Sequence, residues 1–134
     1  MFNELAKEIN TGVREKGFWK SMHEALAAIA EYQKANNEKQ YPYISEKATK
    51  DAFIAQKIGL IMSECGEALE AMRRFEYEAN GYGIGVKDSF ADEIADTIIR
   101  LLDLCGELNI NIDAQIQWKM DYNNGRSEKH GKEF

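Results

Sequence analysis

The chain has 134 residues, a formal net charge of -6 at pH 7 and an isoelectric point of about 5.0. Its length suits one domain with a single core, so we expect one domain over residues 1–134. The acidic balance argues against a nucleic-acid surface, which needs a basic patch. Residues 1–8 lack the apolar core of a signal peptide, and no apolar run reaches the length that spans a membrane. We therefore expect a cytoplasmic protein with neither nucleic acid nor membrane as a partner.

The first part of the chain predicts two helices. Apolar residues recur at helical spacing over residues 2–16, and no long stretch of the chain shows strand-like alternation. Ser21 would cap a second helix, with Glu24 three residues on completing a capping box. Pro42 then stops any helix and marks the longest linker. These features favour an all-α fold.

Phe18 and Trp19 lie between these two helices, directly after Gly17. Two large aromatic residues outside a periodic segment allow two interpretations. Trp19 stacks on a nucleotide base, since every base has a π-face, or it is a plug in the core. Burial in the core is the commoner arrangement for a pair of aromatic residues.

The remainder of the chain predicts three more helices. A long one follows Ser45, which can cap it, and ends before a glycine-rich break at residues 80–85. Another begins at Asp88 or Ser89, and a last one covers residues 113–122. The sequence thus predicts a bundle of four to five helices. The two long helices form an antiparallel hairpin at its centre, because a short break favours antiparallel packing.

Two acidic pairs lie on this hairpin, Glu64-x-x-Glu67 on its first helix and Glu93-x-x-Asp96 on its second. Residues three apart are neighbours on a helix surface, so each pair can converge on one ligand. Each of the four acids directly precedes an expected core position. In an antiparallel hairpin this shared offset carries all four carboxylates to the same edge.

Four clustered carboxylates repel one another unless a cation lies among them. Hard oxygen ligands of this kind suit Mg²⁺, with Mn²⁺ as a possible substitute. The alternative is an acidic helix face that is exposed to solvent and binds no metal. A carboxylate-bridged di-iron site is less favoured, because it expects a histidine three residues after a glutamate and neither pair has one.

The expected seam between the two long helices is apolar. Its members are Ile54, Ile58, Ile61, Cys65, Ala68 and Met72 on the first helix, and Phe90, Ile94, Thr97 or Ile98, Leu101, Cys105 and Leu108 on the second. The two cysteines are expected to be reduced packing residues. The second helix also carries apolar residues off this seam, which predicts a second packing surface and an isologous dimer.

The C-terminal stretch is basic although the chain as a whole is acidic. Lys119 and Asn123 lie four apart on the last helix, and Arg126 follows Gly125. A cation and an amide at this spacing can face one point and bind phosphates that a metal leaves unneutralised. The alternative is a solubilising tail. Further candidates for anion contacts are Lys129, His130 and Lys132.

The two acidic pairs, separated by 25 residues on two helices of a small all-α chain, resemble those of the MazG-like nucleoside triphosphate pyrophosphohydrolases. Residues 119–132 look like the C-terminal signature of the short bacterial and phage-type members. Gly17-Phe18-Trp19 is similar to an N-terminal element of the same group.

This resemblance implies Mg²⁺-dependent hydrolysis of a nucleoside or deoxynucleoside triphosphate between the α and β phosphates, which gives the monophosphate and pyrophosphate. The matching metal ligands are Glu64, Glu67, Glu93 and Asp96. The residues that match nucleotide or phosphate contacts are Lys119, Asn123, Arg126 and, for the base, Trp19. Glu64 or Glu67 would be the general base. Family members assemble as homodimers or homotetramers, and the expected location is the cytoplasm of a bacterium, or of its host if the protein is phage-encoded.

Two alternatives stay open. The substrate could be phosphoribosyl-ATP, which the C-terminal signature fits less well, or the chain could be a non-catalytic helical interaction module. The sequence also leaves open the preferred base and sugar, the number of metal ions, dimer or tetramer, and a role in pool sanitation or in nucleotide supply.

Overall fold

The computed structural model describes residues 1–36, 46–74 and 79–126, and within these ranges it contains six helices and no strand. The predicted all-α fold is confirmed. The helices are α1 (Phe2–Glu15), α2 (Lys20–Asn36), α3 (Glu46–Arg73), α4 (Ala79–Gly83), α5 (Phe90–Glu107) and α6 (Ile112–Asn124). None of these helices is long and apolar enough to cross a membrane. Ser45, Pro42 and the segment 127–134, with its three predicted anion contacts, lie outside the described residues.

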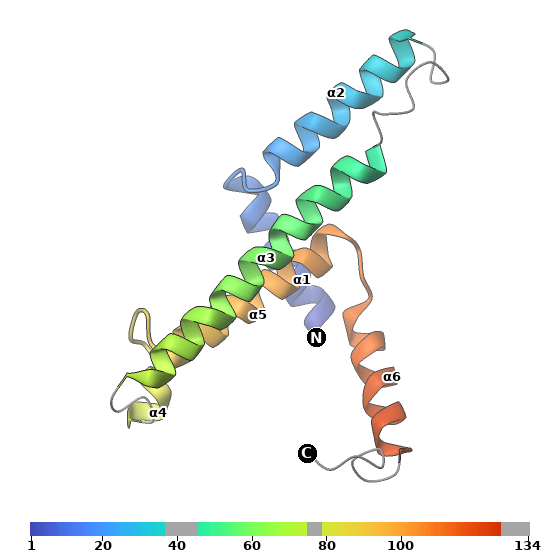
Figure 1. The fold of residues 1–134 in the computed structure, drawn as a ribbon. Coiled ribbons are helices and arrows are strands. Elements are labelled where there is room, and N and C mark those ends of the chain that lie inside the picture. The colour runs from blue at the N-terminus through green and yellow to red at the C-terminus, as the bar shows by residue number, and fades with distance from the viewer. Residues whose placement is uncertain (37–45, 75–78, 127–134) are drawn as a thin grey trace.

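The centre of the fold is the hairpin of α3 and α5, which lie side by side and run in opposite directions (Figure 1). Ser89 begins α5, because its hydroxyl accepts a hydrogen bond from the Asp92 N–H at 3.2 Å and donates one to the Gly83 carbonyl at 2.7 Å. Gly83 has a φ of +85°, and a Cβ there would come within 2.4 Å of the Ser89 Cβ. The turn therefore needs glycine at this position.

The other helices attach to the hairpin at different places. α1 packs on α5, where a Cβ on Gly106 would lie 2.6 Å from the Ala6 carbonyl oxygen. α2 packs on α3, and its start at Lys20 places Ser21 inside the helix, so the predicted capping box is wrong. α6 contacts α1 and points away from the hairpin (Figure 1). Within the described residues one chain thus forms an open arrangement of helices, and the expected bundle of four to five helices is not confirmed.

Trp19 is the centre of the core. Its side chain is 1% exposed and packs with Met22, Ile61 and Leu104. Its Nε1–H donates to both carboxylate oxygens of Asp103, at 3.0 Å each. Because the ring is almost fully buried, the structure supports the alternative in which Trp19 fills the core, and it leaves no exposed ring face for a base in this fold.

The predicted seam between α3 and α5 is confirmed only in part. Its members Ile61 and Ala68 are buried, and Ile54, Phe90, Thr97, Cys105 and Leu108 are half-buried. Its exposed members are Ile58, Cys65, Met72, Ile94, Ile98 and Leu101. The other buried positions on these helices include Glu64, Ala71 and Glu93. The two helices are rotated so that alanines and carboxylates face the partner helix. The small alanine side chains allow this close approach, while the large apolar side chains turn outward.

Seven of the outward apolar side chains form what we call the free face. They are Ile58, Met62, Leu69 and Met72 on α3 and Ile94, Ile98 and Leu101 on α5, each between 39% and 69% exposed. The side chains of Cys65 and Thr97, whose Sγ and Oγ1 lie 3.9 Å apart, bridge the two helices along this side. Because antiparallel helices carry equal rotational offsets to the same side, the seven side chains belong to one continuous surface.

A buried polar network joins α1, α2 and α5. The Glu107 carboxylate, 3% exposed, accepts hydrogen bonds from Arg14 at 2.7 and 2.9 Å and from Asn10 at 3.1 Å. His23 Nε2 lies 2.6 Å from Glu107 Oε1, the carboxylate oxygen that Asn10 does not contact. Asn10 also donates to Asp103 at 2.8 Å. Burial alone would raise the pKa of Glu107, but its hydrogen bonds from Arg14, His23 and Asn10 outweigh burial and lower the pKa to about 2.

We expect acid to destabilise the fold through Glu107. A carboxyl group whose pKa is lower in the folded state stabilises it above the ordinary pKa of 4.5, and this stabilisation is lost as the pH falls from 4.5 to about 2. The loss should be on the order of 2 kcal/mol in the free energy of unfolding. Urea unfolding at pH values from 7 to 2 measures it. The Glu107→Gln variant should be less stable at pH 7, and its free energy of unfolding should change less between pH 4.5 and pH 2. If the free energies of unfolding of variant and parent changed equally over this pH range, Glu107 would not be the group responsible.

Candidate functional site

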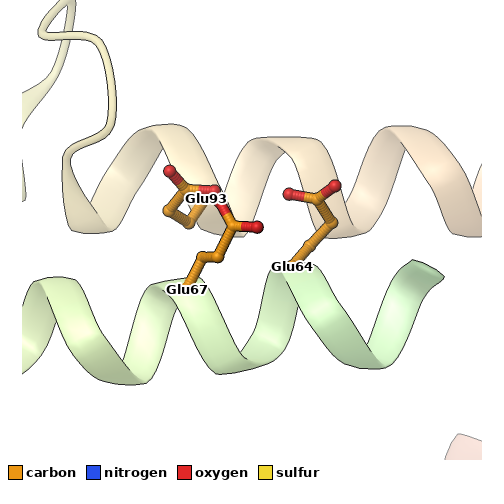
Figure 2. A group of neighbouring side chains, drawn as sticks. All are labelled: Glu64, Glu67 and Glu93. Atoms are coloured by element: carbon orange, nitrogen blue, oxygen red, sulfur yellow. The ribbon is translucent and has the colours of Figure 1, made fainter. Parts of the chain in front are cut away.

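Glu64, Glu67 and Glu93 form one cluster on the hairpin, where the first turn of α5 lies beside the last part of α3. Each offers a carboxylate oxygen within 4.8 Å of the other two. Glu64 and Glu67 project from α3 toward α5, where they meet Glu93 (Figure 2). Glu64 and Glu93 are buried, at 8% and 3% exposure, whereas Glu67 is exposed. The structure thus brings together three of the four predicted metal ligands.

The cluster is electrostatically strained in the absence of a cation. Burial raises the pKa of Glu93, and so does the negative charge of Glu67. Lys87 opposes this shift, and Glu64 and Asp96 add smaller contributions that raise the pKa further. A buried carboxylate among other carboxylates is stabilised in its charged form by a bound cation. Three oxygen ligands at this spacing fit a hard divalent ion such as Mg²⁺.

Asp96 lies one turn after Glu93 on α5 and is not a member of the three-carboxylate cluster. Its side chain instead lines a neighbouring cavity together with Arg100. Of the four acids expected along one edge of the hairpin, Asp96 therefore lies outside the group of three in this structure, although its charge still acts on Glu93.

Arg100 is a neighbour of the cluster that the sequence analysis missed. Its Nε donates to Glu64 Oε1 at 2.6 Å, which fixes the Glu64 carboxylate from the α5 side. Arg100 follows Asp96 by four residues, so the two lie on one face of the helix. The signal was present in the sequence: Glu93, Asp96, Arg100, Asp103 and Glu107 follow one another at alternating spacings of three and four, which makes a polar stripe along all of α5.

A second acidic group, Asp88, Asp92 and Glu93, lies at the start of α5. Asp92 is already partnered there: the Asp88 N–H donates to it at 2.8 Å, and the Lys87 ammonium lies 3.2 Å away. These contacts, the Asp88 hydrogen bond first, lower the pKa of Asp92. Because Lys87 supplies a positive charge, this group is the weaker candidate for a metal.

The C-terminal candidates lie elsewhere. Lys119 and Asn123 are on α6, and Arg126 follows that helix. The Lys119 ammonium lies 5.0 Å and the Arg126 guanidinium 5.2 Å from the centre of the Tyr122 ring. α6 points away from the hairpin (Figure 1). Within one chain the structure therefore does not bring these three residues to the acidic cluster.

Comparison with protein-family models, with curated proteins and with solved structures found no match to this chain.

Proposed function

We propose that the protein is a Mg²⁺-dependent nucleoside triphosphate pyrophosphohydrolase of the MazG-like type, with Mn²⁺ as a possible substitute for Mg²⁺. The observation that carries this proposal is the cluster of Glu64, Glu67 and Glu93, in which two buried carboxylates and one exposed carboxylate meet between two helices. The motif resemblance adds the substrate class, a nucleoside or deoxynucleoside triphosphate. The products would be the monophosphate and pyrophosphate.

The three glutamates have different surroundings, which suggests a division of roles. Glu93 and Glu64 are buried and would hold the ion together with Glu67, and Arg100 keeps Glu64 oriented. A bound Mg²⁺ neutralises phosphate oxygens and acidifies a water molecule. Glu67 is exposed, so its carboxylate can reach solvent and accept the proton of the attacking water. We therefore favour Glu67 as the general base and Asp96 as a further ligand that approaches when the ion is bound.

Product analysis tests the reaction. We expect incubation with each of the eight common nucleoside and deoxynucleoside triphosphates and Mg²⁺ to release monophosphate and pyrophosphate from at least one of them. Chromatography separates these products from the diphosphate and phosphate that cleavage of the terminal group would give. If no triphosphate is cleaved but phosphoribosyl-ATP is, the chemistry stands with another substrate. If none of them is cleaved, the alternative of a non-catalytic helical interaction module is favoured.

We also propose that the free face is covered by a second copy of the chain. Seven large apolar side chains in one continuous strip exceed the scattered exposure that is normal for a monomer. An antiparallel hairpin that meets its own copy through such a strip forms a four-helix core with isologous contacts. Lys119, Asn123 and Arg126 could then serve a site only across the interface, because within one chain they lie apart from the acids.

Light scattering after size exclusion tests the dimer. The parent chain should give at least twice its mass of 15.3 kDa. Met62→Lys, which places a charge on the most exposed residue of the free face, should give the monomer. Val86→Lys makes the same kind of change at a side chain that is 55% exposed on the turn before α5 and should leave the mass unchanged. A monomeric parent would rule out the dimer.

A further inference from the structure

A cavity of about 310 Å³ lies beside the acidic cluster. Three cationic side chains line it, Lys16, Lys57 and Arg100, and Asp96 lies on its wall. Arg100 belongs to the cavity and to the cluster at once, because its Nε bonds Glu64 at 2.6 Å. The cavity and the three carboxylates are therefore adjacent parts of one region of the fold.

The three cations come from separate elements and meet because of how those elements pack. Lys16 caps the C-terminal end of α1, Lys57 lies in the middle of α3, and Arg100 lies on α5. Lys57 is held in place: its ammonium donates to the Phe18 carbonyl at 3.0 Å and lies 4.5 Å from the centre of the Trp19 ring. Three cationic residues thus line one cavity of a chain whose net charge is -6.

Two carboxylates, Asp96 and Asp103, share the wall with the three cations and oppose part of their charge. Asp103 is turned to the core, where its two oxygens accept from the Trp19 Nε1–H and one of them also from Asn10. A guanidinium has five N–H donors, and the bond of Arg100 to Glu64 uses one of them. Cationic residues that line one cavity suit phosphate oxygens, because charge-assisted hydrogen bonds are the strong ones.

We propose that this cavity is an anion site that binds the phosphate chain leaving as pyrophosphate, with Lys16, Lys57 and Arg100 as its ligands. The statement that these phosphates belong to a nucleotide rests on the proposed function. The expected binding of a diphosphate in the cavity does not. Asp96 and Arg100 join the two regions, so a phosphate chain in the cavity lies next to the carboxylates that hold the metal. The site needs no residue of α6, and so supplies phosphate ligands within one chain.

Calorimetric titration of the full chain with inorganic pyrophosphate, in buffer with a chelator and no divalent ion, tests the proposal. The parent should bind pyrophosphate, and Lys16→Gln and Lys57→Gln should each weaken binding about tenfold, as expected for one charge-assisted hydrogen bond. Lys20→Gln is the matched control: Lys20 lies nearby at the start of α2, is paired with Glu24 and does not line the cavity. Lys57→Arg, which keeps the charge, should bind within a few-fold of the parent and shows that any loss in Lys57→Gln is not a folding defect.

Two results would overturn the proposal: no pyrophosphate binding by the parent, or an equal loss in Lys20→Gln and the cavity variants. These results are independent of the proposed function. If the protein hydrolyses nucleotides but the cavity variants bind pyrophosphate as the parent does, the anion-site proposal is wrong and the proposed enzyme activity stands. Pyrophosphate binding that depends on Lys16 and Lys57, without any hydrolysis, would keep the anion site and remove the enzyme.

Discussion

Replacing Glu67 by glutamine is expected to reduce hydrolysis by roughly 10²–10⁴-fold, the range for loss of a general base. It should also abolish stabilisation by Mg²⁺. An ion that binds only the folded state raises its stability by mass action, by about 2.7 kcal/mol at a concentration of 100 times its dissociation constant. The parent should therefore melt at a higher temperature with Mg²⁺, and Glu67→Gln should not. Turnover assays and thermal melts with and without Mg²⁺ measure both effects.

The charge repulsion within the cluster provides a further test of the same variant. The charge of Glu67 raises the pKa of Glu93, so removal of that charge relieves repulsion in the metal-free protein. Without Mg²⁺ the variant should thus be at least as stable as the parent, which separates loss of a ligand from loss of folding. Asp51→Asn is the control, because Asp51 is an exposed acid on the same helix that pairs with Lys47 far from the cluster. An equal response of parent and Glu67→Gln to Mg²⁺ would show that the cluster holds no metal.

Trp19→Ala is expected to lower the free energy of unfolding by about 3–5 kcal/mol, the cost of emptying a large aromatic site in a core. Trp19 is 1% exposed, and its indole N–H is a hydrogen-bond donor to the buried Asp103. Urea unfolding measures the change. Where Trp19→Ala is too unstable to study, Trp19→Phe keeps most of the volume and removes only the donor. This change should cost about 1–3 kcal/mol, because the carboxylate of Asp103 loses a partner in a buried place.

The same variants separate the two interpretations of the aromatic pair. A residue that stacked on a base would affect nucleotide affinity and hardly affect stability, and a plug does the reverse. Phe18→Ala is the natural comparison, because the neighbouring Phe18 side chain is 61% exposed. It should change stability by less than about 0.5 kcal/mol, as most surface changes do. A loss of less than about 1 kcal/mol in Trp19→Ala would contradict the core role of Trp19.

The sequence predicts the hairpin and its acids well because both depend on local signals. The period of α3 and α5 and the short glycine-rich break fix two antiparallel helices. The three-residue spacing of Glu64 and Glu67 fixes their common face. These two signals do not depend on which side of a helix is turned inward. The expected meeting of the acids of α3 with those of α5 did depend on it, because it was argued from their offset to the seam.

The rotation of the helices could not be predicted in the same way. α5 carries two stripes of helical period, one polar through Asp96 and Arg100 and one apolar through Ile94 and Leu101. We assigned the apolar stripe to the inner face, because burial of charge is costly unless it is paired. In the fold the polar stripe is paired, by Arg100 with Glu64 and by Arg14 with Glu107. These partners come from distant elements, and a single helix pattern does not show them.

The choice between base stacking and a place in the core for Trp19 was left open for a similar reason. Adjacent residues in a turn point in different directions, and the backbone of the turn decides which one enters the core. Gly17 has a φ of +82°, which sets the direction of the chain into α2. The sequence shows the glycine but not the orientation that results from it.

The pairing of α1 with α5 has a consequence for the order of folding. Asn10 and Asp103, which bond across this pair, are separated by 93 residues, whereas α3 and α5 are joined by a short connection. Contacts between neighbouring segments form faster than contacts between distant ones. The hairpin should therefore form first and α1 should dock onto it late. At roughly 5–20 residues per second during synthesis, the ribosome completes α5 about 5–20 s after α1, so the first helix made is the one that waits longest for its partner.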